Sequence, residues 1–377
     1  MIIDGSTQPG YAGTPLITID AAAVTTSDVM RVWTGGGGTT LRDFNVINAA
    51  SVAVFVGDGA GDNLITNVHA SWGGSSAAGT GFWITDSDNN TIREVTATNR
   101  VQSVVLRDAN DNLVENSYLS GSGVGVVLAL ASSGNTIQNN VVSGSGFGVR
   151  SSSSGSGNRY LSNDLSQSTN YALDIFNESS FVVAGNDFTD SFAGVRLGNM
   201  DGLTLSPNPD FDIDVSTASL ASYVGALALT NVTNSTISGF DLTSASAAAQ
   251  GGAGLVVSGG SNNVIEDLTV TDRTWGVYAN GGLTDTLFQR VDASWGGAAA
   301  AGTGFWITNS DNNTIRSATA TNRVQAVVLR DANNNLVENS NLSGSGVGVV
   351  LALVSGGNTI HNNDGSGSGF GVRSSSS

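Results

Sequence analysis

The chain repeats itself on two scales, and this most constrains its fold. Residues 70–154 and 293–377 align at an offset of 223 positions, and 72 of the 85 aligned residues are identical. A shorter period is carried by phrases in which a polar residue, often Asn, stands two positions before an aliphatic one. From Leu64 these phrases recur after 28, 21 and 24 residues, and the same steps follow Leu287. So short a period fits one coil of a β-solenoid rather than a pair of helices.

The segments between the turns alternate as β-strands do. In "GVGVVLAL", Val126 and Leu128 would point to one side of the strand and Val127 to the other. Glycine every few residues would undermine a helix. The sequence therefore predicts an all-β parallel solenoid of about 15 coils, each of 21–28 residues.

Stacking the phrases predicts ladders of equivalent residues about 4.8 Å apart. The aliphatic ladder is expected to contain Leu64, Ile92, Leu113 and Ile137, and in the second half Leu287, Ile315, Leu336 and Ile360. Two polar ladders are expected at corners, one of Asp62, Asn90, Asp111, Asn135 and Asn158, the other of Asn67, Asn116, Asn140 and Asn163. Stacked Asn amides bond along the axis and tolerate left-handed backbone, so we interpret these residues as corner formers rather than catalysts.

These phrases, and the opening "IDGSTQPGYAGTPLITIDAAAV", resemble the bacterial right-handed parallel β-helix proteins of the pectate-lyase-like superfamily, of the exported multi-repeat type. The resemblance covers nearly the whole chain and implies one continuous right-handed β-helix over residues 1–377. Residues 204–230 are its least regular stretch. Because the superfamily includes lyases, hydrolases, epimerases, adhesins and structural coils, the resemblance implies a fold more than a function.

Charge and composition exclude several classes of partner. The net charge is −17, and all 14 basic residues are Arg, so binding to nucleic acid or to anionic membranes is disfavoured. The absence of Cys excludes disulfides and thiolate chemistry. No apolar run is long enough for membrane insertion. The first residues lack the features of a signal peptide, so the extracellular or cell-surface location that we expect requires a signal outside this chain.

Strand alternation predicts an exposed contact face. Phe82 and Ile84 should face inward, so Trp83 should face outward. Asp174 and Arg196 are expected at equivalent positions between the two halves. The rest of the outward row is mostly apolar: Phe55, Trp83, Val105, Val127 and Gly148, then Val256, Tyr278, Trp306, Val328, Val350 and Gly371. Soluble monomers seldom expose so much contiguous apolar area, so a loop, a partner or a glycan should cover it.

The longest coil adds a second tryptophan to this face. Trp72 precedes Trp83 in the first copy, and Trp295 precedes Trp306 in the second. Two interpretations remain open. The loop presents Trp72 beside Trp83 as a platform for a sugar ring or a neighbouring chain, or it folds down and Trp83 covers it. The candidate binding residues are therefore Phe55, Trp72, Trp83, Val105, Val127, Tyr278, Trp295, Trp306, Val328 and Val350.

Signals for catalysis are weaker than those for binding. Three acids of the first copy are replaced in the second, as Asp86→Asn309, Glu94→Ser317 and Asp111→Asn334, so at most one copy could use them. Arg107 could pair with Asp86 one coil away, but an exposed pair of this kind contributes only about 0–1 kcal/mol. We expect no catalytic residue in this face.

No cofactor is expected. Asp58 and Asp62 in "GDGAGDN" could hold calcium, yet they lack the repeated acidic spacing of a calcium loop, so a loop corner is the favoured interpretation.

Two hypotheses of function follow. The favoured one is a non-catalytic extracellular structural rod, of a surface, adhesive or filament-forming kind, which is a segment of a longer array and associates end to end or laterally. The alternative is a carbohydrate-active enzyme, such as a polysaccharide lyase or hydrolase, or a glycan-binding module on the same fold. The sequence leaves the question of enzymatic activity open, with repetition and the lack of a charged cleft arguing against it.

Overall fold

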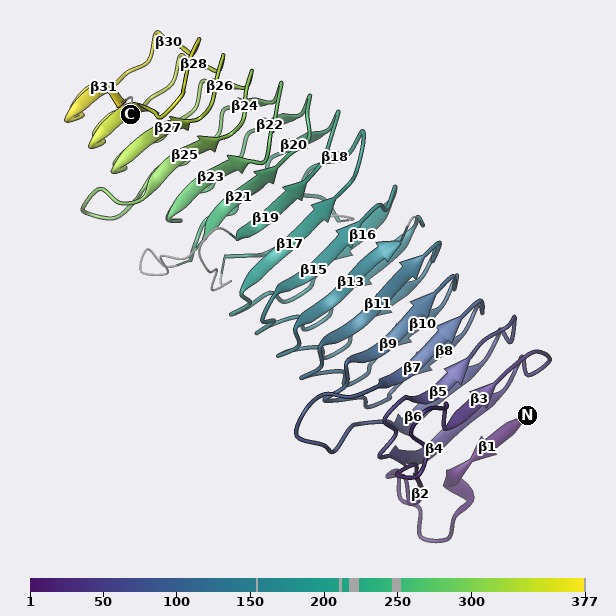
Figure 1. Ribbon diagram of the computed structural model, residues 1–377. Helices are drawn as coiled ribbons and strands as arrows, with labels where there is room; N and C mark the ends of the chain where they lie inside the picture. The colour runs from purple at the N-terminus through teal and green to yellow at the C-terminus, as the bar shows by residue number, and fades with distance from the viewer. Residues whose placement is uncertain (154, 210–211, 217–223, 246–251, 376–377) are drawn as a thin grey trace. The chain divides into compact units, whose positions relative to one another are not determined.

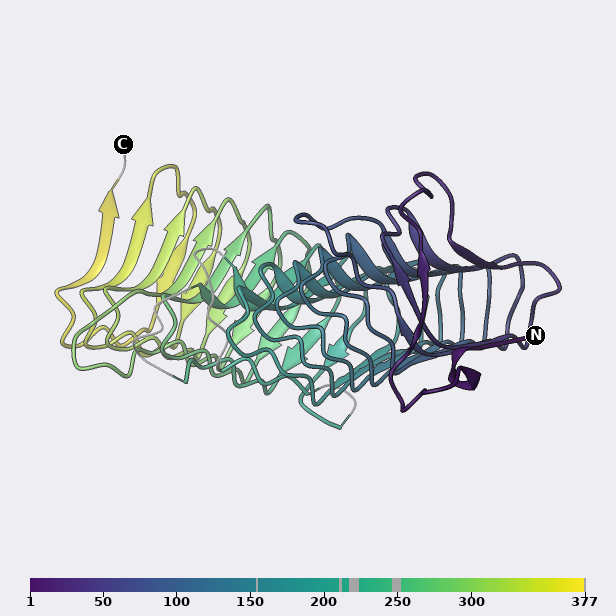
Figure 2. The same ribbon diagram turned by 90° about the horizontal axis from the view of Figure 1, so that it is seen from below.

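The computed structural model describes residues 1–377 except 154, 210–211, 217–223, 246–251 and 376–377. The chain divides into two compact units, Met1–Phe188 and Thr189–Ser377. Each unit is a parallel β-solenoid, and the strands of successive coils lie side by side within it (Figures 1 and 2). The predicted fold class is confirmed. The described residues contain one short 3-10 helix, Gly5–Thr7, and no helix among them is long and apolar enough to cross a membrane.

In the first unit each coil contributes a long strand to one sheet and a further strand to a second sheet. The first sheet contains β3 (Met30–Val32), β5 (Val52–Val56), β7 (Thr80–Thr85), β9 (Gln102–Arg107), β11 (Val124–Leu130), β13 (Phe147–Ser153) and β15 (Tyr171–Phe176). The second contains β1 (Ile2–Asp4), β2 (Ile17–Asp20), β4 (Thr40–Ile47), β6 (Leu64–His69), β8 (Thr91–Arg93), β10 (Leu113–Glu115), β12 (Thr136–Gln138), β14 (Asn158–Leu161) and β16 (Phe181–Ala184).

The second unit has the same plan. Its long strands are β17 (Ala193–Gly198), β19 (Gly225–Thr230), β21 (Ala253–Ser258), β23 (Trp275–Asn280), β25 (Thr303–Thr308), β27 (Gln325–Arg330), β29 (Val347–Ala352) and β31 (Phe370–Ser375). Its short strands are β18 (Thr204–Leu205), β20 (Thr236–Ser238), β22 (Val264–Glu266), β24 (Leu287–Gln289), β26 (Thr314–Arg316), β28 (Leu336–Glu338) and β30 (Thr359–His361).

One long strand per coil gives about 15 coils in the described residues of the two units together, as predicted. That residues 1–377 form one continuous β-helix stays a prediction. The predicted irregular stretch, residues 204–230, contains β18 and β19, while its residues 210–211 and 217–223 lie outside the described part of the chain.

The core of the first unit is a ladder of buried side chains. In two of its coils, the buried residue is the one that follows the predicted residue. Ile92 and Ile137 belong to it as predicted, but they align with Ile65 and Val114, which are fully buried. The predictions for Leu64 and Leu113 were wrong, because these residues align with Thr91 and face the other way. In the second unit Phe288 and Val337 likewise replace the predicted Leu287 and Leu336.

The Asn residues decide this register. Asn63 Nδ2 donates to Asn90 Oδ1 at 2.8 Å, and the chain of amides continues through Asn112, Asn135 and Asn158 at 2.9, 3.1 and 3.2 Å. The predicted members Asp62 and Asp111 were wrong: a carboxylate cannot donate to the next rung, and both residues instead form turns with φ of 61° and 54°. Each ladder Asn stands two residues before a buried apolar residue, and this spacing selects Ile65 over Leu64.

The second polar ladder is partly as predicted. Asn140 Nδ2 donates to Asn163 Oδ1 and Asn163 Nδ2 to Asn186 Oδ1, both at 3.0 Å. Asn67 and Asn116 were wrongly included; they adopt φ of 50° and 51° at the turn one residue earlier. Ser117, not Asn116, is the rung below Asn140, because its backbone N–H donates to Asn140 Oδ1 at 3.1 Å.

Three fully buried arginines hold other corners together: Arg100, Arg273 and Arg323. Their guanidinium groups donate to backbone carbonyls of neighbouring coils. Arg323, for example, donates to Ala293 O at 2.6 Å, Arg273 O at 2.7 Å and Ser294 O at 3.0 Å. Burial lowers the pKa of each guanidinium to about 10. Arg100 and Arg323 lie against the rings of Trp72 and Trp295 and so position the loops that carry them.

Candidate functional site

In the first unit, the outward-facing residues at equivalent positions of the long strands form a line across the sheet, which we call the outer row. Phe55, Trp83, Val105 and Val127 are successive partners in register, as the sequence predicted. The row begins with Arg31, and after Val127 it continues with Arg150 and Asp174. Gly148 was wrongly placed in the row, because the coil between Val127 and Arg150 has 23 residues rather than the 21 assumed.

The second unit carries an equivalent row. Its members in register are Arg196, Ala228, Val256, Tyr278, Trp306, Val328, Val350 and Arg373. Gly371 was predicted at the position that Arg373 occupies, and the error has the same cause as that at Gly148. Each row therefore has an aliphatic and aromatic centre with an arginine on either side of it, and in the first unit Asp174 follows Arg150.

The rows are less exposed than expected. Val105, Val127, Val328 and Val350 face outward but are only 4%, 9%, 3% and 7% exposed. Trp306 packs against the cluster formed by Val328, Val347 and Val350, so neighbouring coils cover the valines. The expectation of a continuous exposed apolar stripe was wrong, because aliphatic side chains one coil apart shield each other. Among the apolar members of the rows, the half-buried aromatic residues are the accessible ones, namely Phe55 and Trp83 in one row and Tyr278 and Trp306 in the other.

In the first unit the aromatic part of the row is closed by stacking. The rings of Trp33 and Phe55 stack with centroids 5.5 Å apart, and the Arg31 guanidinium lies 4.1 Å from the Trp33 ring and 4.9 Å from the Phe55 ring. The Phe55 ring lies over Gly57, where a Cβ would stand 2.6 Å from Phe55 Cε1. Trp83 lies in the next coil, and its indole Nε1 is buried without a hydrogen-bond partner.

In the second unit the equivalent position, beside Tyr278 and Trp306, is a pocket of about 330 Å³. Tyr278 and Trp306 line it together with Thr308, Asn309, Arg330 and Asp331. The Tyr278 ring lies 6.1 Å from the Trp275 ring, at an interplanar angle of 43°. Arg330 Nε lies 4.0 Å from Asp331 Oδ2, so the one cationic and one anionic side chain of the pocket balance each other. Sequence patterns predicted the two aromatic residues of the pocket but not the four polar ones, although Arg330 and Asp331 repeat Arg107 and Asp108 of the first copy.

Trp72 and Trp295 belong to loops that pack down on the solenoid. The Trp72 ring lies 6.0 Å from the Arg100 guanidinium, and the Trp295 ring lies 5.7 Å from that of Arg323. Asn99 fixes the first loop by donating from Nδ2 to Trp72 O at 3.2 Å and to Gly74 O at 2.7 Å. Packing on a buried arginine agrees with the interpretation in which the loop folds down.

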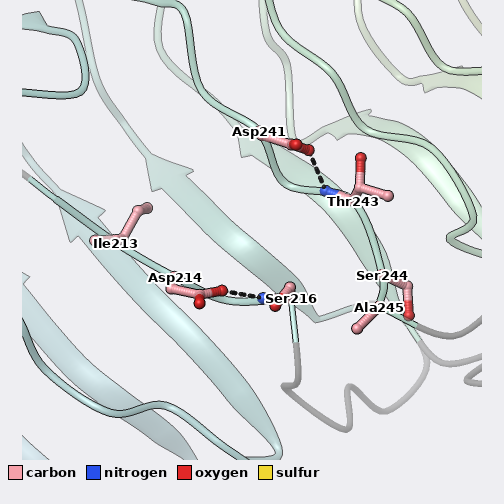
Figure 3. Close-up of a pocket in the computed structure, with 7 residues that line it drawn as sticks. All are labelled: Ile213, Asp214, Ser216, Asp241, Thr243, Ser244 and Ala245. Carbon is pink, nitrogen blue, oxygen red and sulfur yellow. Dashed lines mark hydrogen bonds between the residues drawn. The ribbon is translucent and has the colours of Figure 1, made fainter.

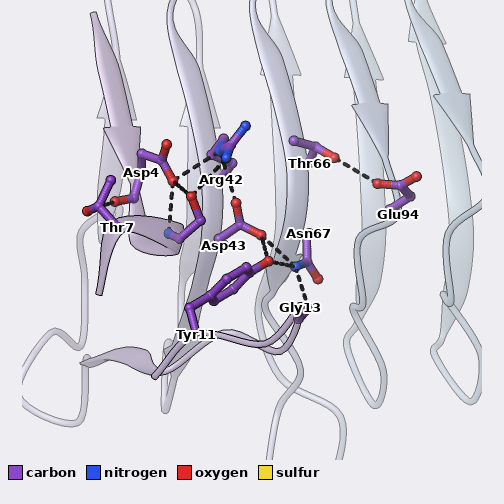
Figure 4. A network of polar contacts seen from close by, with 10 residues as sticks. Asp4, Thr7, Tyr11, Gly13, Arg42, Asp43, Thr66, Asn67 and Glu94 are labelled. Carbon is purple, nitrogen blue, oxygen red and sulfur yellow. Dashed lines mark hydrogen bonds and ion pairs between the residues drawn. The ribbon is translucent and has the colours of Figure 1, made fainter. Parts of the chain in front are cut away.

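A polar pocket of about 450 Å³ lies on the outer face of β4, β6 and β8 (Figure 4). Tyr11 reaches across from the N-terminal segment, and its hydroxyl donates to Asp43 Oδ1, which also accepts from Asn67 Nδ2 at 2.7 Å. Asp43 Oδ2 lies 3.0 Å from Arg42 Nε. The hydrogen bond from the Tyr11 hydroxyl to the Asp43 carboxylate raises the pKa of Tyr11. Because both oxygens of Asp43 are engaged, this carboxylate anchors the N-terminal segment and is poorly placed to act as a base.

The other residues that line this pocket are Gly13, Thr66, Arg93 and Glu94. Thr66 Oγ1 donates to Glu94 Oε2 at 3.1 Å. The sequence analysis missed the cluster, because its members are 83 positions apart at the extremes and only the folded N-terminal segment unites them. The available signal was the adjacent charged pair Arg42 and Asp43 within a strand, β4.

A third pocket, of about 420 Å³, lies in the second unit (Figure 3). Its two carboxylates each cap a turn: Asp214 accepts from Ser216 N and Asp241 accepts from Thr243 N, both at 3.0 Å. The lining also includes Ile213, Ser244 and Ala245, and the chain on either side runs into residues 217–223 and 246–251, which the structure does not describe.

The predicted charged partners are not brought together as an active site. Arg107 aligns with Thr85 rather than with Asp86, and in the described part of the chain these two charges form no ion pair. Asp58 and Asp62 adopt φ of 53° and 61°, as turn residues do. No group of three or more His, Asp or Glu side chains that could hold a metal ion occurs among the residues that the structure describes. Calcium binding stays untested.

Comparison with known proteins identifies the fold. Residues 31–192 and 215–377 match the family model described as a right-handed β-helix region. A search of curated protein sequences gives no significant match.

Several solved structures are distantly similar. One is the receptor-binding protein of bacteriophage Det7, a podoviral tailspike in a myovirus, with 13% identity, a TM-score of 0.39, and coverage of 86% of this chain and 68% of that one. Another is PfbA, a surface adhesin of Streptococcus pneumoniae, with 14% identity, a TM-score of 0.32, and coverage of 94% and 83%. A third is the periplasmic alginate epimerase AlgG, with 9% identity, a TM-score of 0.33, and coverage of 92% and 83%. At such identities the similarity concerns the fold alone.

Proposed function

The chain belongs to the right-handed β-helix family, and on that premise we propose that it is a non-catalytic structural protein of the extracellular space or the cell surface, of an adhesive or filament-forming kind. The proposal concerns the outer rows of the long-strand sheets. They serve as lateral contact faces between copies of the chain. The proposed location follows from the exported multi-repeat proteins that the opening coil resembles.

One observation carries this proposal. At the centre of both rows stand aromatic and aliphatic side chains where a hydrolase of this kind of fold would need two carboxyl groups within about 5–9 Å of each other. The aromatic side chains remain partly accessible, while the valines beside them are covered. Accessible aromatic side chains on a sheet support association by burial of aromatic surface, and aromatic residues and arginine are the types enriched in protein interfaces.

The proposal predicts self-association that depends on the aromatic residues. Sedimentation velocity of the wild type over a hundredfold range of concentration is expected to show a growing fraction of oligomers. The double variant Trp83→Ser, Trp306→Ser is expected to stay monomeric, because it removes the largest accessible apolar side chain of each row. Circular dichroism establishes that the variant is folded. A wild type that is monomeric at every concentration contradicts the proposal.

A second candidate is a carbohydrate-active protein on the same fold, and the pocket beside Trp306 favours it. Incubation with a panel of polysaccharides distinguishes binding from cleavage. We expect no release of reducing or unsaturated ends. The wild type would be an enzyme if it released such ends and one of two variants did not. The two variants are Arg330→Ala, Asp331→Asn and Arg107→Ala, Asp108→Asn.

A further inference from the structure

The two outer rows differ in the coils that precede the two copies of the long repeat. Trp83, Thr85 and Arg107 of the first copy correspond to Trp306, Thr308 and Arg330 of the second. The walls of the site are therefore the same in both copies. What differs is the coil before the tryptophan and one side chain at the turn after it, where Asp86 is replaced by Asn309.

In the first copy the preceding coil fills the space between the walls. Trp33 stacks on Phe55 at 5.5 Å and Arg31 lies against both rings, so the Phe55 ring is held over Gly57. A Cβ added at Gly57 would lie 2.6 Å from Phe55 Cε1 and 3.3 Å from Thr85 Cγ2. A side chain at position 57 would collide with the Phe55 ring and crowd Thr85, so glycine at this position is what leaves room for the ring.

In the second copy each of these features is changed. Val256 and Ser258 stand at the positions of Arg31 and Trp33, so the guanidinium and the ring that these two positions supply in the first copy have no counterpart there. Asn280 takes the position of Gly57, where a side chain leaves no room for a ring. The Tyr278 ring lies beside Trp275, three residues away, and the pocket of about 330 Å³ opens between Tyr278, Trp306 and Arg330.

We propose that this pocket of the second copy is a binding site for a neutral hexopyranose unit of a polysaccharide, and that the first copy has no such site because Phe55 fills it. This inference rests on the glycan-binding candidate above. An indole and a phenol ring offer flat apolar surface to the C–H face of a pyranose ring. Asn309, Arg330, Asp331 and Thr308 provide both donors and acceptors for hydroxyl groups. The volume is at the lower end of that found in small-ligand sites.

Charge selects a neutral sugar over an acidic one. Arg330 is already balanced by Asp331 at 4.0 Å, so the pocket has no uncompensated cation for a carboxylate or a sulfate group. The net charge of −17 adds long-range repulsion against a polyanion.

The test is affinity electrophoresis and fluorescence titration of the full chain with neutral glucans, galactans and mannans, and with alginate and polygalacturonate as anionic comparisons. The variants are Trp306→Ala and, as a matched control, Trp83→Ala, which removes the same residue from the other copy. We expect the wild type to bind at least one neutral polysaccharide. We expect Trp306→Ala to weaken that binding by about tenfold or more, and Trp83→Ala to change it by less than about twofold.

The outcomes separate this inference from the candidate function on which it rests. Equal loss of binding in both variants, or loss only in Trp83→Ala, overturns the assignment to the second copy although glycan binding stands. Preferential binding of the anionic polysaccharides overturns the choice of a neutral sugar. Failure of the wild type to bind any polysaccharide overturns both. Thermal melting of the two variants provides the control for folding, since each loses one tryptophan at the same position of the coil.

Discussion

Replacing Arg323 by methionine is expected to lower the free energy of unfolding by about 3 kcal/mol. The guanidinium is fully buried and donates to three backbone carbonyls, of Ala293, Arg273 and Ser294. Methionine fills most of the same volume but donates no hydrogen bond, so the carbonyls of Ala293 and Arg273 lose this donor, at about 1–3 kcal/mol for each buried group, while Ser294 O keeps the backbone N–H of Asp272 at 3.4 Å. Burial of the charged guanidinium is itself unfavourable, and it lowers the pKa of Arg323 to about 10. Removal of this buried charge offsets part of the loss.

Urea denaturation followed by circular dichroism measures this effect. The matched control is Arg330→Met, whose side chain is 49% exposed and whose carboxylate partner stands 4.0 Å away. The control is expected to change the stability by no more than about 0.5 kcal/mol. If Arg323→Met is as stable as the control, the buried arginines do not hold the corners, and the packing described for Trp295 would need another cause.

Replacing Glu178 by glutamine is expected to stabilise the first unit at neutral and alkaline pH by about 1–3 kcal/mol. Glu178 is only 2% exposed, and its Oε1 accepts from the hydroxyls of Ser151 and Tyr160. Its Oε2 is buried without a hydrogen-bond partner. Burial raises the pKa of this carboxyl above its ordinary value of 4.5, so the ionised form costs stability in the folded chain.

The raised pKa of Glu178 sets the sign of the pH dependence of stability. Because the folded-state pKa lies above the unfolded-state value, the contribution of Glu178 to stability is fully present below the unfolded pKa. It is lost as the pH rises through the folded pKa. Thermal melting from pH 4 to pH 8 should therefore show a loss of stability in the wild type that Glu178→Gln removes. The exposed Glu94→Gln serves as the control, and identical pH profiles for wild type and Glu178→Gln would contradict the argument.

The sequence was sufficient for the fold and for most of the outer rows, for physical reasons that particular residues illustrate. The alternation around Trp83 places it outward because strand geometry has a period of two, and this held for Phe55, Val105 and Val127. The register failed where two aliphatic residues adjoin, as at Leu64 and Ile65. There the amide ladder through Asn63 decides, and it could have been recognised by requiring a donor at every rung.

Other features depend on contacts between coils that no single phrase contains. The valines of the rows are buried by side chains one coil away, and Tyr11 meets Asp43 only because the N-terminal segment crosses the sheet. The pocket beside Trp306 is lined by residues of three successive coils, with Tyr278 from the coil before and Arg330 from the coil after. The buried arginines did leave a signal: Arg100, Arg273 and Arg323 each stand two residues before a long strand.

Electron microscopy of the purified protein at high concentration tests the central claim most directly, because lateral association through the outer rows has a visible product. We predict bundles or sheets in which solenoids lie side by side, and their absence in Trp83→Ser, Trp306→Ser. Discrete, unassociated particles of the wild type under all conditions, together with an unchanged appearance of the variant, would contradict a structural role built on these rows.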